Sequence, residues 1–181
     1  MHDNSRAPLK RFLAAIGLVL LLYIPIVTVI FLQRVGGAHQ LRPGERVPAL
    51  TLRSLDSLTV SILGLSGKRA ALLFFSPDCP RCRQEISNIN RLFRAYNDKY
   101  VFTGISSGSA GQTRDFVNAH EIVFPIFLDG NGEAKKAFGV FEVPTLFLVR
   151  ADGVIAYVGT GAEPLEARRR LLADDAGEQG K

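Results

Sequence analysis

The stretch Phe74-Phe75-Ser76-Pro77-Asp78-Cys79-Pro80-Arg81-Cys82-Arg83 holds both cysteines of this 181-residue chain. The apolar run Ala70–Phe75 predicts a buried strand, because it is too short and too closely flanked by polar residues to cross a membrane. Beyond the cysteines, apolar residues recur at helical spacing, at Ile86, Ile89, Phe93 and Tyr96. The two cysteines are therefore expected where a central strand turns into a helix.

Two thiols with two residues between them can close into a disulfide and reopen, which is redox chemistry. A structural zinc site needs four ligands, and the histidines offer no partners, since His2, His39 and His120 lie far apart in the sequence. A disulfide across so short a loop removes little entropy from the unfolded chain, so it is a poor structural staple. The spacing favours a redox-active pair over a metal site or a structural bridge.

The expected helix Pro80–Tyr96 assigns different roles to the two thiols. Cys79 stands at its N-terminus, where unpaired backbone N–H groups and the helix dipole favour a thiolate, so Cys79 is the expected nucleophile. Cys82 lies one turn further in and is the expected resolving thiol. Pro80 suits the first helical position, because the N–H it lacks would be unpaired there. Asp78 and Arg81 add opposite charges beside the pair.

The longest apolar segment is Phe12–Leu32, 21 residues without a charged side chain. At about 1.5 Å per helical residue this length crosses the hydrocarbon core of a bilayer, and Pro25 is tolerated in a membrane helix. The alternative is a cleaved signal peptide with its cleavage site at residues 36–38. Because the apolar part of a signal peptide is usually only about 7–15 residues long, an uncleaved anchor is favoured.

The basic residues on the two sides of this segment are nearly balanced, so charge alone does not orient it. A short N-terminus followed by a large domain favours export of the domain, which places it on the periplasmic or extracytoplasmic side of the inner membrane. Gly and Pro are frequent between the anchor and the domain, as in linkers. The predicted organisation is a cytoplasmic N-terminus 1–11, a transmembrane anchor 12–33, a linker 34–48, a domain 49–173 and a polar tail 174–181.

The remaining pattern predicts an α/β domain with a central mixed β-sheet and helices on both of its faces. Residues Asp152-Gly153 are expected to form a two-residue hairpin turn. The other expected elements are short strands within 49–65, strands 100–106, 124–128, 145–149 and 154–158, and helices 112–120, 133–138 and 163–172.

The net charge of +5 is concentrated at the N-terminus, since residues 1–35 contribute +3 of it. No block rich in Lys and Arg with interleaved aromatic residues occurs in the sequence. The sequence therefore predicts that nucleic acid is not a partner.

The cysteine stretch, with Val143-Pro144-Thr145 downstream and the strand–Asp-Gly–strand ending, resembles the thioredoxin superfamily. It is most similar to the membrane-anchored TlpA/ResA-like redoxins, and also to the methylamine-dehydrogenase maturation proteins, over about Pro43–Leu172. The resemblance implies a thioredoxin-like fold and thiol–disulfide oxidoreductase activity with no cofactor besides the Cys79–Cys82 disulfide. It also implies a cis Pro144 facing that disulfide and a Val143 backbone that pairs with the substrate chain.

The same resemblance implies protein partners. Thiol or disulfide proteins would be the substrates, a membrane thiol protein would donate or accept electrons, and maturation of cytochrome c or another metalloprotein would be the process served. The direction of electron flow stays open at this stage.

Three departures from the thioredoxin pattern concern the site. Asp78 stands where a tryptophan usually precedes the first cysteine, and Leu73 stands where thioredoxin has a buried acid. Glu142 could replace that acid, although a solvated loop charge is the simpler interpretation. The pair Pro80-Arg81 between the cysteines is similar to the strongly oxidising DsbA type. Asp78, Pro80, Arg81 and Glu142 are thus the expected modulators of thiol acidity.

Two other functions fit parts of the pattern. A peroxiredoxin needs Pro seven residues and Thr or Ser three residues before its cysteine; Ser76 fits this pattern, but position 72 is Leu. A copper-binding assembly factor would use the thiols as soft ligands, but the single methionine is Met1 and no histidine adjoins the pair.

Overall fold

The computed structural model describes residues 16, 21–28, 39–56, 58–61, 67–161 and 163–177. The chain divides into two compact units, Met1–Gly37 and Ala38–Lys181. Residues 21–28 of the first unit are helical. Within the described ranges no helix is long and apolar enough to cross a membrane. Most of the predicted anchor 12–33 lies outside the described residues.

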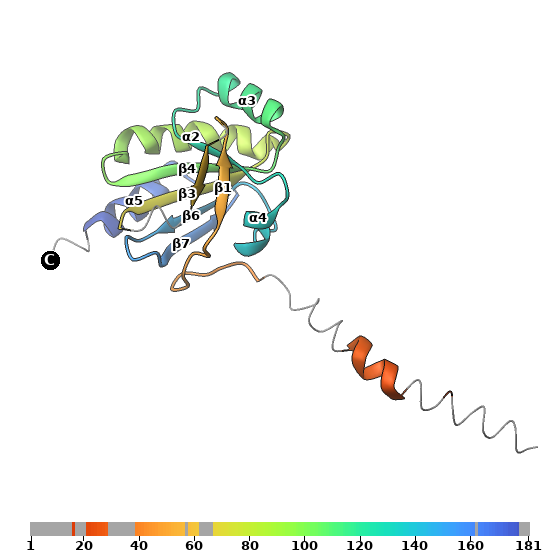
Figure 1. Cartoon of the computed structure of the whole chain (residues 1–181). Helices are drawn as coiled ribbons and strands as arrows, with labels where there is room; N and C mark the ends of the chain where they lie inside the picture. Colours follow the sequence, from red (N-terminus) through yellow and green to blue (C-terminus); the bar gives the residue numbers. More distant parts are fainter. Residues whose placement is uncertain are drawn as a thin grey trace, which may run out of the picture. The chain divides into compact units, whose positions relative to one another are not determined.

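In the second unit, the described residues form a seven-stranded sheet in the order β2-β1-β5-β4-β3-β6-β7 (Figure 1). Strand β3 pairs in parallel with β4 and antiparallel with β6, so the sheet is mixed, as the sequence predicts. The strands are β1 Thr51–Ser54, β2 Thr59–Ser61, β3 Arg69–Phe75, β4 Tyr100–Ser106, β5 Ile126–Leu128, β6 Thr145–Val149 and β7 Ile155–Thr160.

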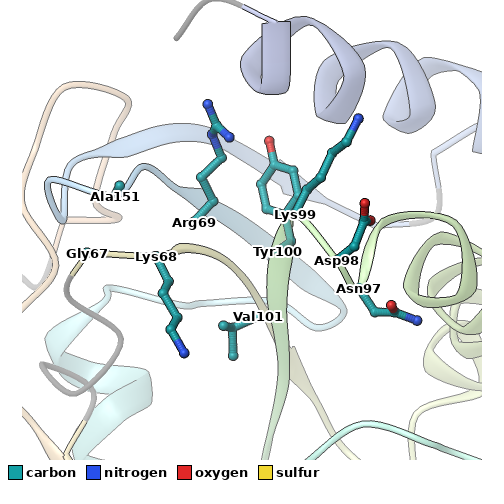
Figure 2. A pocket seen from close by; sticks show the side chains of 9 residues that line it. All are labelled: Gly67, Lys68, Arg69, Asn97, Asp98, Lys99, Tyr100, Val101 and Ala151. Carbon is teal, nitrogen blue, oxygen red and sulfur yellow. The ribbon is translucent and has the colours of Figure 1, made fainter. Parts of the chain in front are cut away.

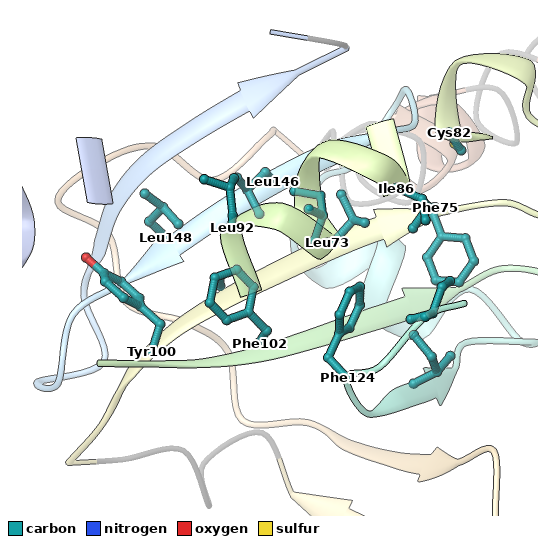
Figure 3. Packing of buried hydrophobic residues seen from close by; sticks show 14 of the residues in the cluster. Leu73, Phe75, Cys82, Ile86, Leu92, Tyr100, Phe102, Phe124, Leu146 and Leu148 are labelled. Atoms are coloured by element: carbon teal, nitrogen blue, oxygen red, sulfur yellow. The ribbon is translucent and has the colours of Figure 1, made fainter. Parts of the chain in front are cut away.

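Helices lie on both faces of the sheet because β3 is apolar on both sides. Its residues Leu73 and Phe75 point into a core packed by α2 (Figure 3), to which Ala71 and the helices α3 and α5 also contribute. The alternate residues point into a second core packed by α4. Burying each large side chain contributes about 1.5–3 kcal/mol. The helices are α2 Pro80–Tyr96, α3 Ala110–Ala119, α4 Glu133–Ala137 and α5 Leu165–Gly177. This arrangement is the thioredoxin-like α/β fold expected from the sequence.

Part of the segment predicted as a linker, 34–48, packs on the domain. The N–H of Leu41 donates to the carbonyl oxygen of Phe138 at 3.0 Å, and the N–H of Gly44 donates to that of Ile155 at 2.8 Å. The apolar side chains of Leu41 and Val47 contact the second core, which explains why residues 39–47 follow the domain surface.

Two local predictions were wrong. The turn between β6 and β7 has three residues, 151–153, closed by the N–H of Arg150 donating to the carbonyl oxygen of Val154 at 2.9 Å. Gly153, with φ +79°, supplies the left-handed position that such a turn needs. Helix α5 continues to Gly177, so the first four residues of the predicted tail 174–181 are helical. No helix-breaking residue precedes Gly177 there.

Candidate active site

The two cysteines are placed by the junction of β3 and α2. Cys79 is the N-cap of α2, with φ −87° and ψ 114°, and Pro80 opens the helix. The Cys79 sulfur accepts a hydrogen bond from the backbone N–H of Cys82 at 3.2 Å. The N–H of Cys79 donates to the carbonyl oxygen of Ser76 at 3.1 Å. A sulfur therefore occupies the capping place that Ser, Thr or Asp usually takes, where a negative charge is stabilised.

The two thiols differ sharply in exposure. Both cysteines are free, Cys79 is half-buried, and Cys82 is fully buried against the first core, beside Ile86 (Figure 3). Burial, together with the hydrogen bond to Cys79, raises the pKa of Cys82 to about 12. The Cys79 sulfur is therefore the more accessible of the two, and its role as nucleophile stays a prediction.

The predicted substrate-binding residues lie against Cys79. The peptide bond between Val143 and Pro144 is cis, as expected from the sequence. The Cys79 thiol donates to the carbonyl oxygen of Val143 at 3.4 Å. Pro144 is buried while Val143 is half-buried, so backbone polar groups of this turn lie beside the half-exposed sulfur. An extended substrate segment could pair with such a backbone.

The four predicted modulators of thiol acidity, Asp78, Pro80, Arg81 and Glu142, are all exposed. Within the described part of the chain, the side chains of Asp78, Arg81 and Glu142 make no ion pair or hydrogen bond. The backbone oxygen of Glu142 accepts a hydrogen bond from the Thr145 hydroxyl at 2.7 Å. Glu142 is thus a solvated loop charge, in agreement with the simpler interpretation of the sequence.

Sequence reasoning missed the acid that the structure places near the thiols. Glu85 lies one helical turn after Cys82 and is fully buried. Burial raises the pKa of Glu85 to about 7, while the guanidinium of Arg168 acts in the opposite direction. The charge of Glu85 in turn raises the pKa of Cys82. A signal was present in the sequence, because a glutamate between Cys82 and Ile86 falls on the apolar face of the helix.

No group of three or more His, Cys, Asp or Glu side chains suited to a metal ion occurs among the described residues. A pocket of about 420 Å³ opens at the start of β3 and β4, at the end of these strands opposite the cysteines (Figure 2). Its charged lining side chains are Lys68, Arg69, Asp98 and Lys99. This pocket is separate from the thiol site.

A half-buried thiol at the end of a central strand, a buried second thiol and a cis-proline turn on this sheet define a thioredoxin-like thiol–disulfide oxidoreductase. The family model described as "AhpC/TSA family" matches residues 43–158, which include the cysteines and the cis-proline turn. The chain belongs to this family of redoxins.

Individual relatives agree with this class. The thiol-disulfide oxidoreductase ResA of Oceanobacillus iheyensis is 26% identical over 183 aligned positions, covering 98% of this chain and 95% of the relative. The sporulation thiol-disulfide oxidoreductase A of Bacillus subtilis is 29% identical, covering 66% of this chain and 76% of the relative. The crystal structure of a thiol:disulfide interchange protein DsbE from Chlorobium tepidum superposes with a TM-score of 0.72 at 22% identity. That match covers 76% of this chain and 100% of the structure.

Proposed function

We propose that this chain is a membrane-tethered, extracytoplasmic oxidoreductase that exchanges disulfides with protein substrates through Cys79-Pro80-Arg81-Cys82. The observation that carries the proposal is the asymmetry of the pair. The half-buried Cys79 sulfur lies 3.4 Å from the Val143 carbonyl oxygen, and Cys82 is fully buried one turn further along α2. One thiol can meet a substrate, and the other can react only with the first.

In the reducing direction, the Cys79 thiolate attacks one sulfur of a substrate disulfide. That S–S bond breaks, a mixed disulfide forms, and the second substrate sulfur leaves as a thiolate that takes up a proton. Cys82 then loses its proton and attacks the Cys79 sulfur, releasing the first substrate cysteine. The pair becomes oxidised, and the substrate gains two electrons and two protons.

Cys82 must lose its proton before it can attack, and burial raises its pKa to about 12. Glu85, whose pKa of about 7 lies near neutrality, stands one helical turn away. Its carboxylate is suited to accept the proton that Cys82 loses. Electron flow in the oxidising direction reverses each step and returns that proton.

The proposed location rests on the sequence of the N-terminus. Residues 12–32 are apolar and uncharged, and a short basic segment precedes them. A single span would hold the thiol domain near a membrane-bound thiol protein that renews its redox state. Disulfide-containing precursors of metalloproteins, with the cytochrome c apoprotein first among them, are the proposed clients. No cofactor besides the Cys79–Cys82 disulfide takes part.

The exchange activity is tested by equilibrating the full-length chain with glutathione buffers and measuring the fraction of the Cys79–Cys82 disulfide by mass. The proposal requires a reversible two-electron transition that is absent in Cys79→Ser. A pair that does not cycle with glutathione or dithiothreitol would refute it. Rapid consumption of hydrogen peroxide with no exchange would favour the peroxiredoxin function instead.

The location is tested separately with a membrane-impermeant maleimide applied to intact spheroplasts that produce the full chain, after mild reduction. Labelling of Cys79 without lysis is the expected result, and Cys79→Ser is the control. Labelling that requires lysis would place the domain in the cytoplasm and refute this part of the proposal.

A further inference from the structure

Arg168 is a buried cation in the first turn of α5, with 1% of its surface exposed. Arginine is rarely buried to this degree unless it is paired. One guanidinium nitrogen, Nη1, donates to the Glu85 carboxylate, and Nη2 donates to the carbonyl oxygen of Gly161 at 3.0 Å. The Nε atom lies 3.8 Å from a carboxylate oxygen of Glu163. The planar guanidinium thus contacts two separate segments of the chain, helix α2 and the connection between β7 and α5.

These two segments lead to the two halves of the thiol site. Glu85 belongs to α2, one turn after Cys82. Gly161 follows β7, and its N–H donates to the carbonyl oxygen of Pro144 at 2.7 Å. Two successive hydrogen bonds through Gly161 therefore connect Arg168 to the cis-proline turn. The Arg168 side chain therefore contacts helix α2 directly and the cis-proline turn through Gly161.

The groups around Glu85 come from several elements. Arg168 approaches from α5, Glu163 precedes that helix, and Tyr157 on β7 donates its hydroxyl to the Glu163 carboxylate. On α2 itself, Cys82 stands one turn before Glu85 and Asn88 nearly one turn after it. Arg168 is the cation in this group, so the charge state of Glu85 depends on it more than on any other neighbour. Its effect opposes both burial and the negative charge of Glu163.

We propose that Arg168 is a positioning residue that couples the thiol pair to the cis-proline turn. It keeps the Glu85 carboxylate ionised beside Cys82, and through Gly161 it fixes the turn that carries Pro144. Lysine can supply the charge but cannot donate along two fixed directions, so the two effects can be separated by substitution. The inference rests on the proposed exchange reaction only for its kinetic test.

The charge effect is tested by following the Glu85 carboxyl carbon by NMR against pH in the full chain. In Arg168→Met the midpoint should rise by about 1–3 pH units, because an opposite charge at this distance shifts a carboxyl by that amount. Arg169→Met is the matched control, since Arg169 is the exposed neighbour paired with Glu166. This titration needs no exchange activity, so it remains informative if the proposed function fails.

The effect on the turn is tested by the kinetics of reduction of a disulfide-linked peptide. Arg168→Lys should keep the wild-type pH profile but raise KM about tenfold, since the hydrogen bond to Gly161 is lost. In the wild type, titration of Glu85 should give the pH profile of the rate an inflection near pH 7, which is absent in Glu85→Gln. Arg168→Met should also lose this inflection near pH 7. If Arg168→Met is poorly folded, the double variant Glu85→Gln/Arg168→Met, which leaves no buried charge from the pair, serves in its place; its KM should also rise.

Two results would overturn the inference. One is an unchanged Glu85 midpoint in folded Arg168→Met, which would show that Arg168 does not set the charge. The other is a wild-type KM in both Arg168→Lys and the double variant, which would show that the guanidinium does not fix the turn.

Discussion

The burial of Cys82 leads to a quantitative prediction about its reactivity. Removing the other thiol, as Cys79→Ser, leaves Cys82 alone in its core position, and burial remains the main cause of its raised pKa. With Cys79 in place, the pKa of Cys82 is raised from 9.0 to about 12, which lowers the thiolate fraction at pH 7 about a thousandfold; the variant loses the part of this shift that Cys79 causes. Only the thiolate reacts with an alkylating agent, so Cys82 in this variant should react about a hundredfold to a thousandfold more slowly than an exposed thiol of ordinary acidity.

The assay is the rate of iodoacetamide alkylation of Cys79→Ser between pH 6 and 10, with Cys82→Ser as the comparison and near-UV circular dichroism as the check on folding. The rate for Cys82 should rise about tenfold per pH unit without a plateau in this range. A plateau between pH 8 and 9 in the folded protein would contradict the reasoning, because it would mean that burial leaves the acidity of Cys82 ordinary.

Three further substitutions test the packing and the electrostatics. Folding raises the pKa of Glu85 from 4.5 to about 7, so this carboxyl binds its proton more tightly in the folded state. Its contribution to stability is therefore lost as the pH rises through this interval. Glu85→Gln should remove roughly 2–3 kcal/mol of the fall in unfolding free energy between pH 5 and 8, measured by urea denaturation; the same fall in the variant as in the wild type would contradict this. Asp129→Ala should lower the free energy of unfolding by about 1–2 kcal/mol, because the Asp129 carboxylate accepts hydrogen bonds from two backbone N–H groups of α4 at 2.9 and 2.8 Å. An unchanged urea midpoint would show that these bonds contribute nothing to stability. Gly104→Ala should lower stability by about 1–3 kcal/mol, because an added Cβ would lie 2.4 Å from Ile126 Cδ1 and 3.0 Å from Phe75 Cε1; a neutral effect on thermal unfolding would mean that this core can yield.

The sequence alone predicts the elements on which the thiols depend. The expected helix Pro80–Tyr96 and the expected strand 100–106 agree with α2 and β4 at both ends. These predictions succeed because the helix has an apolar stripe and a proline at its first turn, and because the strand is short and apolar. The hairpin turn was harder, since Asp-Gly fits turns of two and of three residues and the register shift between Leu148 and Val149 depends on pairing.

The parts of the site that escaped prediction depend on contacts distant in sequence. Glu85 and Arg168 are 83 residues apart, and nothing in the local pattern of either residue indicates the other. Arg168 stands beside further arginines in a helix whose apolar face is weakly defined, so the sequence pattern does not indicate that it is buried. A buried carboxylate is stable only with such a partner, and that partner is found only when the chain is folded.

Capture of a substrate by one sulfur tests the central claim most directly. The full-length Cys82→Ser variant, reduced and then mixed with a disulfide-containing protein such as an oxidised apocytochrome, should accumulate a mixed disulfide that peptide mass mapping locates at Cys79. The matched Cys79→Ser variant should accumulate none over the same time. Equal trapping at Cys82, or no mixed disulfide in either variant, would contradict the assignment of Cys79 as the nucleophile of a thiol–disulfide oxidoreductase.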